Sequence, residues 1–529
     1  MVTIPRDRAL AVVTAAGAAG YWLFARRALR LGAVRLAAGG ALLAALAAIV
    51  AFAAFVGAAL APLAGLSFGV GGTLGIMLMV TAMLLCLVIS VSPAPGAASE
   101  SGARTRRKTA GQSERPVALS DRVPSRVMTA GTQSSVGPVA LVAAALVALG
   151  TGTARPAAGQ VARLDGTEIP TDRLTEGIED LVRRADVHGL TVTVFNHGDA
   201  VYSRAFGHAD RPTGRPLATD TELYGASLSK AVFGVLVMRL VEKGVIDLDT
   251  PLQDYLDEPL WRNEGTEWHE DQSALRDDPR YRKITARMAL SHTTGMPNWR
   301  WFEPDQKLRI HFEPGERYQY SGEGMVFLQI ALQNITGKPL EELMREEVFG
   351  PYGMDVSSYT WQPRFEADYA LGHRSDGSTY PRDKDNAARA PSTLETTTDD
   401  YVRFMEAVLR GDGLSAASWE EMFRPQIRIR TRTQFGPGAS EETDANDDIE
   451  LSYGLGWGLL RTPYGWGAFK EGKGDGFQHY SIVFPESGIG VLLMGCSDNA
   501  DSIFDHLLRL TIADAYTPLE WEGYVPFDR

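Results

Sequence analysis

A serine hydroxyl and a lysine amine stand three residues apart in Ser227-Leu228-Ser229-Lys230. A serine attacks a carbonyl carbon poorly until a neighbouring base removes its proton, and residues three apart share one face of a helix. A helix N-terminus also adds partial positive charge where an oxyanion would form. The spacing therefore predicts a Ser227 nucleophile with Lys230 beside it. A helix cap followed by a solvated lysine is the simpler alternative.

The residues directly after Ser227 in the chain must position this pair. Apolar side chains recur at helical spacing after Ser227, namely Leu228, Ala231, Val232, Val235, Leu236, Leu240 and Val241. This period predicts a buried amphipathic helix that carries Ser227 in its first turn and ends at Gly244.

Charge divides the chain into two parts. Of its 52 Lys and Arg and 65 Asp and Glu residues, residues 1–157 hold only 14 and 4. A basic, apolar front therefore precedes an acidic remainder, and neither part resembles a nucleic-acid binder. The two cysteines, Cys86 and Cys496, lie in such different contexts that we expect no disulfide. They form no metal-binding cluster, the acidic stretch 441–450 lacks calcium-loop spacing, and we predict no metal and no cofactor.

The front has the composition of membrane helices. Residues 36–99 carry no charged side chain, and a spanning helix needs about 20 predominantly apolar residues. We predict spans near 36–60 and 68–91 and a shorter one at 9–25, so that residues 1–92 form transmembrane helices that contact the bilayer. A soluble hairpin of buried helices is the alternative.

Basic residues fix the expected orientation through the positive-inside rule. Arginines crowd the segment before residue 36, and residues 93–133 read as a disordered basic linker, so both belong in the cytoplasm. The segment 134–154 then crosses the membrane again or acts as a cleaved signal peptide. In both cases the domain 158–529 lies on the extracytoplasmic side of the cytoplasmic membrane.

The exported part begins and ends with strand patterns. Two β-rich runs, 190–195 and 200–206, flank a short turn and predict a hairpin. Three more runs come late, at 451–460, 477–484 and 488–494. Helical patterns cover 171–189, 284–290, 325–336, 339–349, 398–410, 416–423 and 502–516. This order predicts an α+β fold in which an antiparallel sheet is flanked by helices and carries an all-α inserted region.

Three motifs in this order resemble the serine β-lactamase and penicillin-binding protein superfamily, in the branch of class C β-lactamases and family VIII esterases. Ser227-Leu228-Ser229-Lys230 matches S-x-x-K. Tyr320-Ser321-Gly322 stands where the family has Y-x-N, and Lys470-Glu471-Gly472 stands where it has K-T-G or H-x-G. The resemblance covers about residues 165–518 and implies a β-lactamase/transpeptidase-like domain.

This resemblance implies acyl transfer in two steps. Ser227 would attack a carbonyl carbon and pass its proton to Lys230 and Tyr320, and water would then hydrolyse the acyl-enzyme. By analogy, the backbone N–H groups of Ser227 and Lys473 would hold the oxyanion. A phenol needs nearby cations to act as a base, and we expect Lys230 and Lys470 to supply them.

Two departures from the family pattern bear on the substrate. Gly322 replaces an asparagine that contacts substrate, and Glu471 replaces a hydroxyl that helps to bind the β-lactam carboxylate. A negative charge at that point opposes an anionic substrate, unless Glu471 pairs with Lys470 or Lys473. Esters or peptides with neutral or amine-bearing acyl groups are therefore the expected substrates.

Other polar and aromatic residues have simpler interpretations. His479 and Trp299, like Glu471, are candidates for the rim of the pocket, although aromatic residues in loops commonly serve packing. His292 is expected to have a structural role, and Glu323 to be an acid in the first turn of a helix.

The sequence is compatible with three functions. The first is a membrane-anchored serine hydrolase of small esters or amides. The second keeps the fold but assigns β-lactamase, D,D-peptidase or D-aminopeptidase activity on cell-wall-type substrates. The third is a catalytically silent binding or sensing domain whose signal passes through the membrane helices.

Overall fold

The computed structural model describes residues 159–265, 267–384 and 386–529. The predictions on 1–92, 93–133 and 134–154 therefore lie outside the described residues. Among the residues that are described, no helix is both long and apolar enough to cross a membrane.

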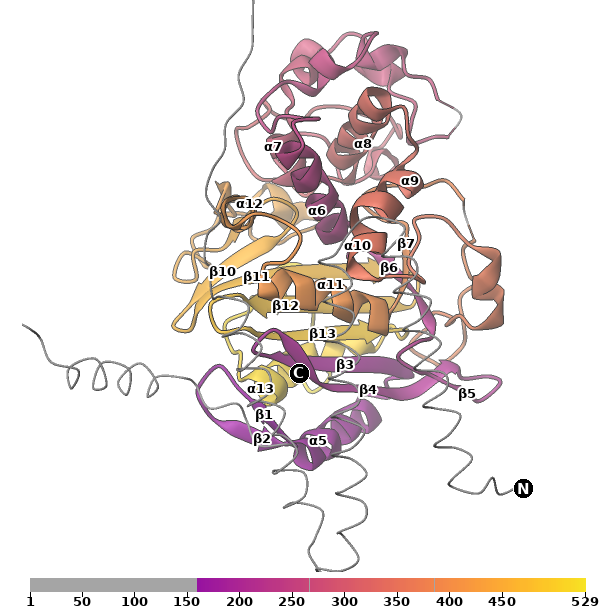
Figure 1. Cartoon of the computed structure of the whole chain (residues 1–529), viewed down its shortest axis with the longest axis vertical. Helices are drawn as coiled ribbons and strands as arrows, with labels where there is room; N and C mark the ends of the chain where they lie inside the picture. The colour runs from indigo at the N-terminus through magenta and orange to yellow at the C-terminus, as the bar shows by residue number, and fades with distance from the viewer. Residues whose placement is uncertain (1–158, 266, 385) are drawn as a thin grey trace, which may run out of the picture. The chain divides into compact units, whose positions relative to one another are not determined.

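A nine-stranded antiparallel sheet forms the centre of the described domain (Figure 1). Its order is β5-β4-β3-β13-β12-β11-β10-β9-β8. The strands are β3 Gly189–Asn196, β4 Asp199–Asp210, β5 Arg215–Pro216, β8 Ile427–Arg428, β9 Ser452–Tyr453, β10 Gly458–Thr462, β11 Gly465–Gly474, β12 Phe477–Phe484 and β13 Ile489–Gly495. Strand β3, from the start of the domain, pairs with β13, from its end. The predicted antiparallel sheet shared by both ends of the domain is confirmed.

Two small sheets stand apart from the large one. Strands β1 Gln160–Ala162 and β2 Glu168–Pro170 form the first of them. Strands β6 Glu222–Ala226 and β7 Leu394–Thr397 form the second, and β6 leads directly into Ser227. This second pair was not predicted.

The helices form two groups around the sheet. They are α5 Thr171–Arg184, α6 Ser229–Glu242, α7 Ala286–Leu290, α8 Gly322–Thr336, α9 Leu340–Met344, α10 Gly350–Tyr352, α11 Thr398–Arg410, α12 Ala416–Met422, α13 Phe504–Ile512 and α14 Leu519–Glu522. Helices α5 and α13 pack on each other and on strands β4 and β13, whereas α11 packs on β3, β12 and β13. Figure 1 shows α7 and α8 in a separate helical region beyond the sheet, between β6 and β7 in the chain. The predicted α+β fold, an antiparallel sheet with flanking helices and an inserted helical region, is thus confirmed.

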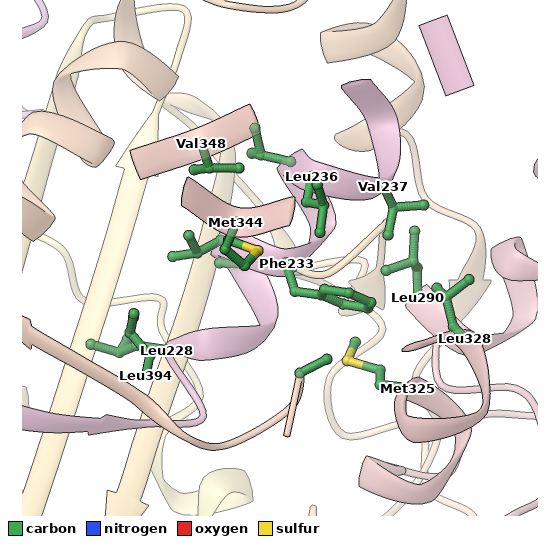
Figure 2. Packing of buried hydrophobic residues seen from close by; sticks show 14 of the residues in the cluster. Leu228, Phe233, Leu236, Val237, Leu290, Met325, Leu328, Met344, Val348 and Leu394 are labelled. Carbon is green, nitrogen blue, oxygen red and sulfur yellow. The ribbon is translucent and has the colours of Figure 1, made fainter. Parts of the chain in front are cut away.

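Helix α6 lies in the middle of the hydrophobic core. Figure 2 shows Phe233 of α6 extending toward Leu290 of α7 and toward Met325 and Leu328 of α8. Nearly every residue from Ser229 to Leu240 is buried. The predicted burial of this helix is confirmed, but buried residues lie on every side of it and not along one stripe, so it is not amphipathic.

Several predicted boundaries differ from the structure for local reasons. The long helix expected at 325–336 begins at Gly322, because the Ser321 side chain accepts a hydrogen bond from the Gly324 N–H at 2.9 Å and caps it. The first helix ends at Arg184, and Gly189 already belongs to β3. The helix expected at 502–516 covers Phe504–Ile512 only, as α13.

The strand run predicted at 451–460 is a tight hairpin. Strands β9 and β10 pair with each other, and the Gly454 N–H bonds to the Trp457 carbonyl between them. Gly456 adopts a positive φ of 87°, which a glycine allows without strain. Strand β11 was missed as a strand, because four glycines interrupt its apolar residues.

We predict that Phe233→Ala destabilises the domain by about 3–5 kcal/mol, because it leaves a cavity between α6, α7 and α8. Thermal unfolding followed by circular dichroism measures the loss. Phe302→Ala is the matched control, since the Phe302 side chain is 67% exposed and the same truncation should change little. Equal midpoints for the two variants would contradict the central place given to α6.

Candidate active site

Ser227 lies in the turn between β6 and α6, and not in the first turn of the helix as predicted. Helix α6 begins at Ser229, and Ala226 adopts a positive φ of 46° just before Ser227. Non-glycine residues in this left-handed region are strained, and such strain persists only where the surroundings hold it. The Ser229 hydroxyl supplies such support, because it donates to the Ala226 carbonyl and accepts the Leu394 N–H. The turn thereby fixes the Ser227 side chain.

Lys230 is buried directly beside this hydroxyl. Its Nζ lies 3.0 Å from Ser227 Oγ and 2.9 Å from the Pro391 carbonyl oxygen, to which it donates. Burial lowers the pKa of the amine well below the usual lysine value, and the charge of Lys470 lowers it further. A buried amine of lowered pKa can accept a proton from a hydroxyl at 3.0 Å.

Tyr320 joins this pair from the N-terminal end of α8. Lys230 Nζ lies 4.7 Å from the centre of its ring, and Lys470 Nζ donates to its hydroxyl at 2.9 Å. Burial raises the pKa of the phenol well above its usual value, and the Glu471 carboxylate raises it further, against a hydrogen bond with Ser227. Lys230 and Lys470 thus stand beside the phenol as expected, but burial outweighs them and the pKa of Tyr320 is raised. The phenol keeps its proton and can donate it.

His292 supports Tyr320 from behind, as its expected structural role implies. Its Nδ1 accepts the N–H of Ser321 at 3.1 Å, and its ring lies 4.3 Å from the Tyr320 ring. Burial and the charges of Lys230 and Lys470 lower its pKa well below the usual value, so the ring stays neutral.

Strand β11 supplies Lys470 and its partner. The Lys470 ammonium is fully buried and lies 2.8 Å from Glu471 Oε1. This ion pair settles the question that the sequence left open, because Glu471 pairs with Lys470 and not with Lys473. Glu471 is buried and therefore does not lie on the rim. Burial lowers the pKa of the Lys470 amine and Glu471 counters that shift, while Lys470 lowers the pKa of the Glu471 carboxyl against the effect of burial; each group thus stabilises the charged form of the other.

Gly472 lets β11 pass close to the nucleophile. A Cβ atom at this position would lie 2.8 Å from the Gly225 carbonyl oxygen, so a side chain would push β11 away from the turn that carries Ser227. Lys473, the next residue, is exposed, and its Nζ lies 3.1 Å from Asp501. Its side chain therefore points away from the Lys470 pair, and only its backbone remains a candidate for the oxyanion contact.

His479 and Trp299, the other two candidates for the rim of the pocket, differ in burial. His479 is fully buried and is not a rim residue; its Nε2 lies 2.7 Å from the Tyr224 carbonyl oxygen and ties β12 to β6. Burial lowers its pKa to about 4, so the ring is neutral. Trp299 is half-buried, and its indole occupies the space beside Gly322, where an added Cβ would lie 3.0 Å away. An asparagine side chain at position 322 would collide there.

Three groups around this cluster were not predicted from the motifs. The Pro391 carbonyl holds Lys230, the Gln434 side chain donates to Glu471 Oε1 at 3.0 Å, and the Phe435 ring lies 5.1 Å from the Tyr320 ring. All three come from irregular segments without a motif, and no pattern of residue types could have indicated them. The cluster as a whole provides a hydroxyl, a proton-accepting amine, a proton-donating phenol and an ammonium.

The family model described as Beta-lactamase matches residues 174–510. The chain is 25% identical over 307 residues to "Penicillin-binding protein 4*" of Bacillus subtilis (strain 168), covering 52% of this chain and 60% of that relative. It is 27% identical over 333 residues to "Esterase EstB" of Burkholderia gladioli, covering 52% and 81%. The match thus spans less than two thirds of the first relative and more of the second.

A solved structure gives the same picture of the fold. The "octameric penicillin-binding protein homologue from Pyrococcus abyssi" superimposes with a TM-score of 0.52 at 20% identity, covering 65% of this chain and 77% of that one. At this identity the likeness concerns the fold alone.

We predict that the reactivity of Ser227 rises with pH. Only the neutral Lys230 amine can accept the hydroxyl proton, and the lowered pKa of Lys230 places the rise below the ordinary lysine value of 10.5. The rate of Ser227 labelling by a fluorophosphonate, followed from pH 5 to 10, measures it. Lys230→Arg keeps a permanent cation and should slow labelling about 10²–10⁴-fold. A labelling rate that is flat up to pH 10 would contradict the assignment.

Proposed function

From the premise that this chain belongs to the Beta-lactamase family and is a serine hydrolase of the acyl-enzyme type, we propose that it is a membrane-anchored, exported hydrolase of small esters or amides. The observation that carries this proposal is the 3.0 Å contact between Ser227 Oγ and Lys230 Nζ, with the Tyr320–Lys470 pair beside it.

Acylation begins with the transfer of the Ser227 proton to the neutral Lys230 amine. The hydroxyl oxygen attacks the carbonyl carbon of the substrate and forms a tetrahedral intermediate with a negative oxygen. The backbone N–H groups of Ser227 and Lys473 are the candidates to hold that oxygen, and one such donor typically contributes about 10²–10³ in rate.

The intermediate then expels the alcohol or amine. Tyr320 donates its proton to the leaving group, and the Lys470 ammonium stabilises the phenolate that forms. The proton on Lys230 can pass back through this hydrogen-bonded cluster. Water then attacks the acyl-enzyme with the same groups acting as base and acid, and releases the carboxylic acid and Ser227.

The charge state of the site supports neutral substrates. Lys470 is neutralised by Glu471, and Lys473 by Asp501, so neither presents an unpaired cation to a substrate carboxylate. Gly322 offers no side-chain amide. Each missing contact to a charged group costs about 1.5–3 kcal/mol. β-Lactamase or D,D-peptidase activity is for this reason the weaker candidate, although relatives carry such names.

We predict that the chain hydrolyses a neutral nitrophenyl ester with a kcat/KM about tenfold or more above that for a chromogenic cephalosporin, which bears a carboxylate. Ser227→Ala should abolish both activities while leaving the unfolding midpoint within a few degrees. Spectrophotometric assays of both substrates decide the question. Hydrolysis of the cephalosporin without hydrolysis of the ester would favour the β-lactamase alternative, and the absence of both, with no labelling of Ser227, would favour a silent binding domain.

The proposed location rests on the sequence of the front. Residues 36–99 lack charge and are bounded by arginine-rich segments, which favours helices that leave and return to the cytoplasm before 134–154 carries the catalytic domain outward. The bilayer is then the partner of the front, and a small ester, amide or peptide is the partner of the site.

We predict that the full chain stays with the membrane fraction after an alkaline wash and that protease added to intact spheroplasts digests residues 158–529. Antibodies to the two parts follow the fragments. A protected catalytic domain would contradict export. Recovery of that domain from the culture medium would instead show cleavage near residue 154.

A further inference from the structure

The C-terminal segment Asp514–Arg529 packs beside the sheet near the active site. Its short helix α14 contributes the buried side chains Leu519 and Trp521, and Tyr524 follows it into the core. The Trp521 carbonyl accepts the backbone N–H of Gln434 at 2.8 Å. The Trp521 indole donates to Thr431 Oγ1 at 3.2 Å. The segment thus holds the loop 429–436 at two points.

That loop reaches the reactive cluster through Gln434. Its side-chain amide donates to Glu471 Oε1 at 3.0 Å, and the same oxygen binds Lys470 Nζ at 2.8 Å. Lys470 in turn donates to the Tyr320 hydroxyl at 2.9 Å. A continuous series of polar contacts therefore runs from the C-terminal segment to the phenol that faces Ser227.

Two other contacts join the same parts. Phe435, next to Gln434, packs edge to face on the Tyr320 ring while remaining 46% exposed, so the loop also borders the mouth of the site. The Tyr524 ring lies 5.7 Å from the Lys473 ammonium. Segment, loop and strand β11 are therefore in contact at more than one place.

We propose that the C-terminal segment is a positioning element of the active site: it holds Gln434 against Glu471 and thereby keeps the Lys470 ammonium on the Tyr320 hydroxyl. Gln434 and Trp521 are its positioning residues. This inference rests on the proposed function, in which Tyr320 and Lys470 protonate the leaving group.

The physical reason lies in how the Glu471 carboxylate is held. Among the described residues, its Oε2 has no hydrogen-bond partner, so the carboxylate is oriented through Oε1 by Lys470 and Gln434. Without the Gln434 amide, the carboxylate can turn toward other donors and draw the ammonium with it. A shift of about 1 Å in a catalytic group can cost on the order of 10²-fold in rate.

The decisive measurement compares two leaving groups on one acyl group. Nitrophenolate leaves without a proton, whereas an alkoxide needs one from Tyr320. Because deacylation is common to both esters, the rates are compared as kcat/KM, which reports acylation. We expect Gln434→Met to lower kcat/KM for an ethyl ester about tenfold and to leave kcat/KM for the nitrophenyl ester of the same acid within about twofold. A general loss of structure would lower both rates together, and equal losses would overturn the proposal.

Gln426→Met is the matched control. Gln426 lies on the same stretch of chain, and its side chain bonds to Glu421 and Arg287, whereas its backbone N–H, which the substitution keeps, bonds to the Tyr453 carbonyl. It should change the unfolding midpoint at most, with the ratio of the two ester rates unchanged. A changed ratio in this control would also count against the proposal.

The hold of the C-terminal segment on the loop 429–436, which we call the clamp, is tested by Trp521→Phe and Thr431→Val. These two variants remove the same hydrogen bond from its two ends. Each should shift the ester ratio in the direction of Gln434→Met, and the double variant should add little to either one. Hydrogen exchange of the amides in 429–436 should become faster in both. Additive effects, or unchanged exchange, would overturn the clamp even if Gln434→Met behaves as expected or does not fold.

Failure of the proposed function is distinguishable from failure of this inference. If the wild-type chain hydrolyses neither ester and a fluorophosphonate does not label Ser227, the proposed function is wrong. The hydrogen-exchange result then still decides whether the C-terminal segment holds the loop.

Discussion

The burial of two lysine side chains against one phenol is the constraint on which the rest of the site depends. Moving an ammonium out of water is costly, and the amine responds by giving up its proton unless a partner compensates. Lys470 has such a partner in Glu471, while Lys230 is bonded to the Pro391 carbonyl and the Ser227 hydroxyl. Burial lowers the pKa of both amines, but the adjacent Glu471 carboxylate counters the shift at Lys470, so the pKa of Lys230 is lowered further. This difference separates a proton acceptor from a stabilising charge within one cluster.

Several elements of the fold maintain the different surroundings of Lys230 and Lys470. Helix α6 is enclosed by α7 and α8 and carries Lys230 in its first turn, and β6 fixes the strained turn that presents Ser227. Gly472 lets β11 approach that turn closely enough for Lys470 to meet Tyr320. Each of these elements comes from a different part of the chain, and the core between them excludes the water that would return a proton to Lys230.

The sequence was sufficient for the parts that local chemistry encodes. Ser227, Lys230 and Tyr320 were recognisable because their types and spacing carry a mechanism, and the hairpin of β3 and β4 because its turn does. Strand β11 was missed because glycines break its pattern, yet one of them, Gly472, is what the close approach to Gly225 requires. Gln434 and the Pro391 carbonyl were beyond reach, since their roles come from tertiary contacts between irregular segments. The pKa of Tyr320 was misjudged because burial of the phenol could not be read from the motif.

The pairing of β3 with β13 has a consequence for biogenesis. Phe195 stands opposite Gly490, so the centre of the sheet closes only when the last strand has been made. Contacts between such distant parts of a chain form slowly, because a long loop must be closed first. A chain of this topology therefore remains open during most of its synthesis. Lys470 lies on β11, late in the chain, so Ser227 and the Lys470 ammonium come together only near the end of synthesis, and a nascent chain carries no assembled site.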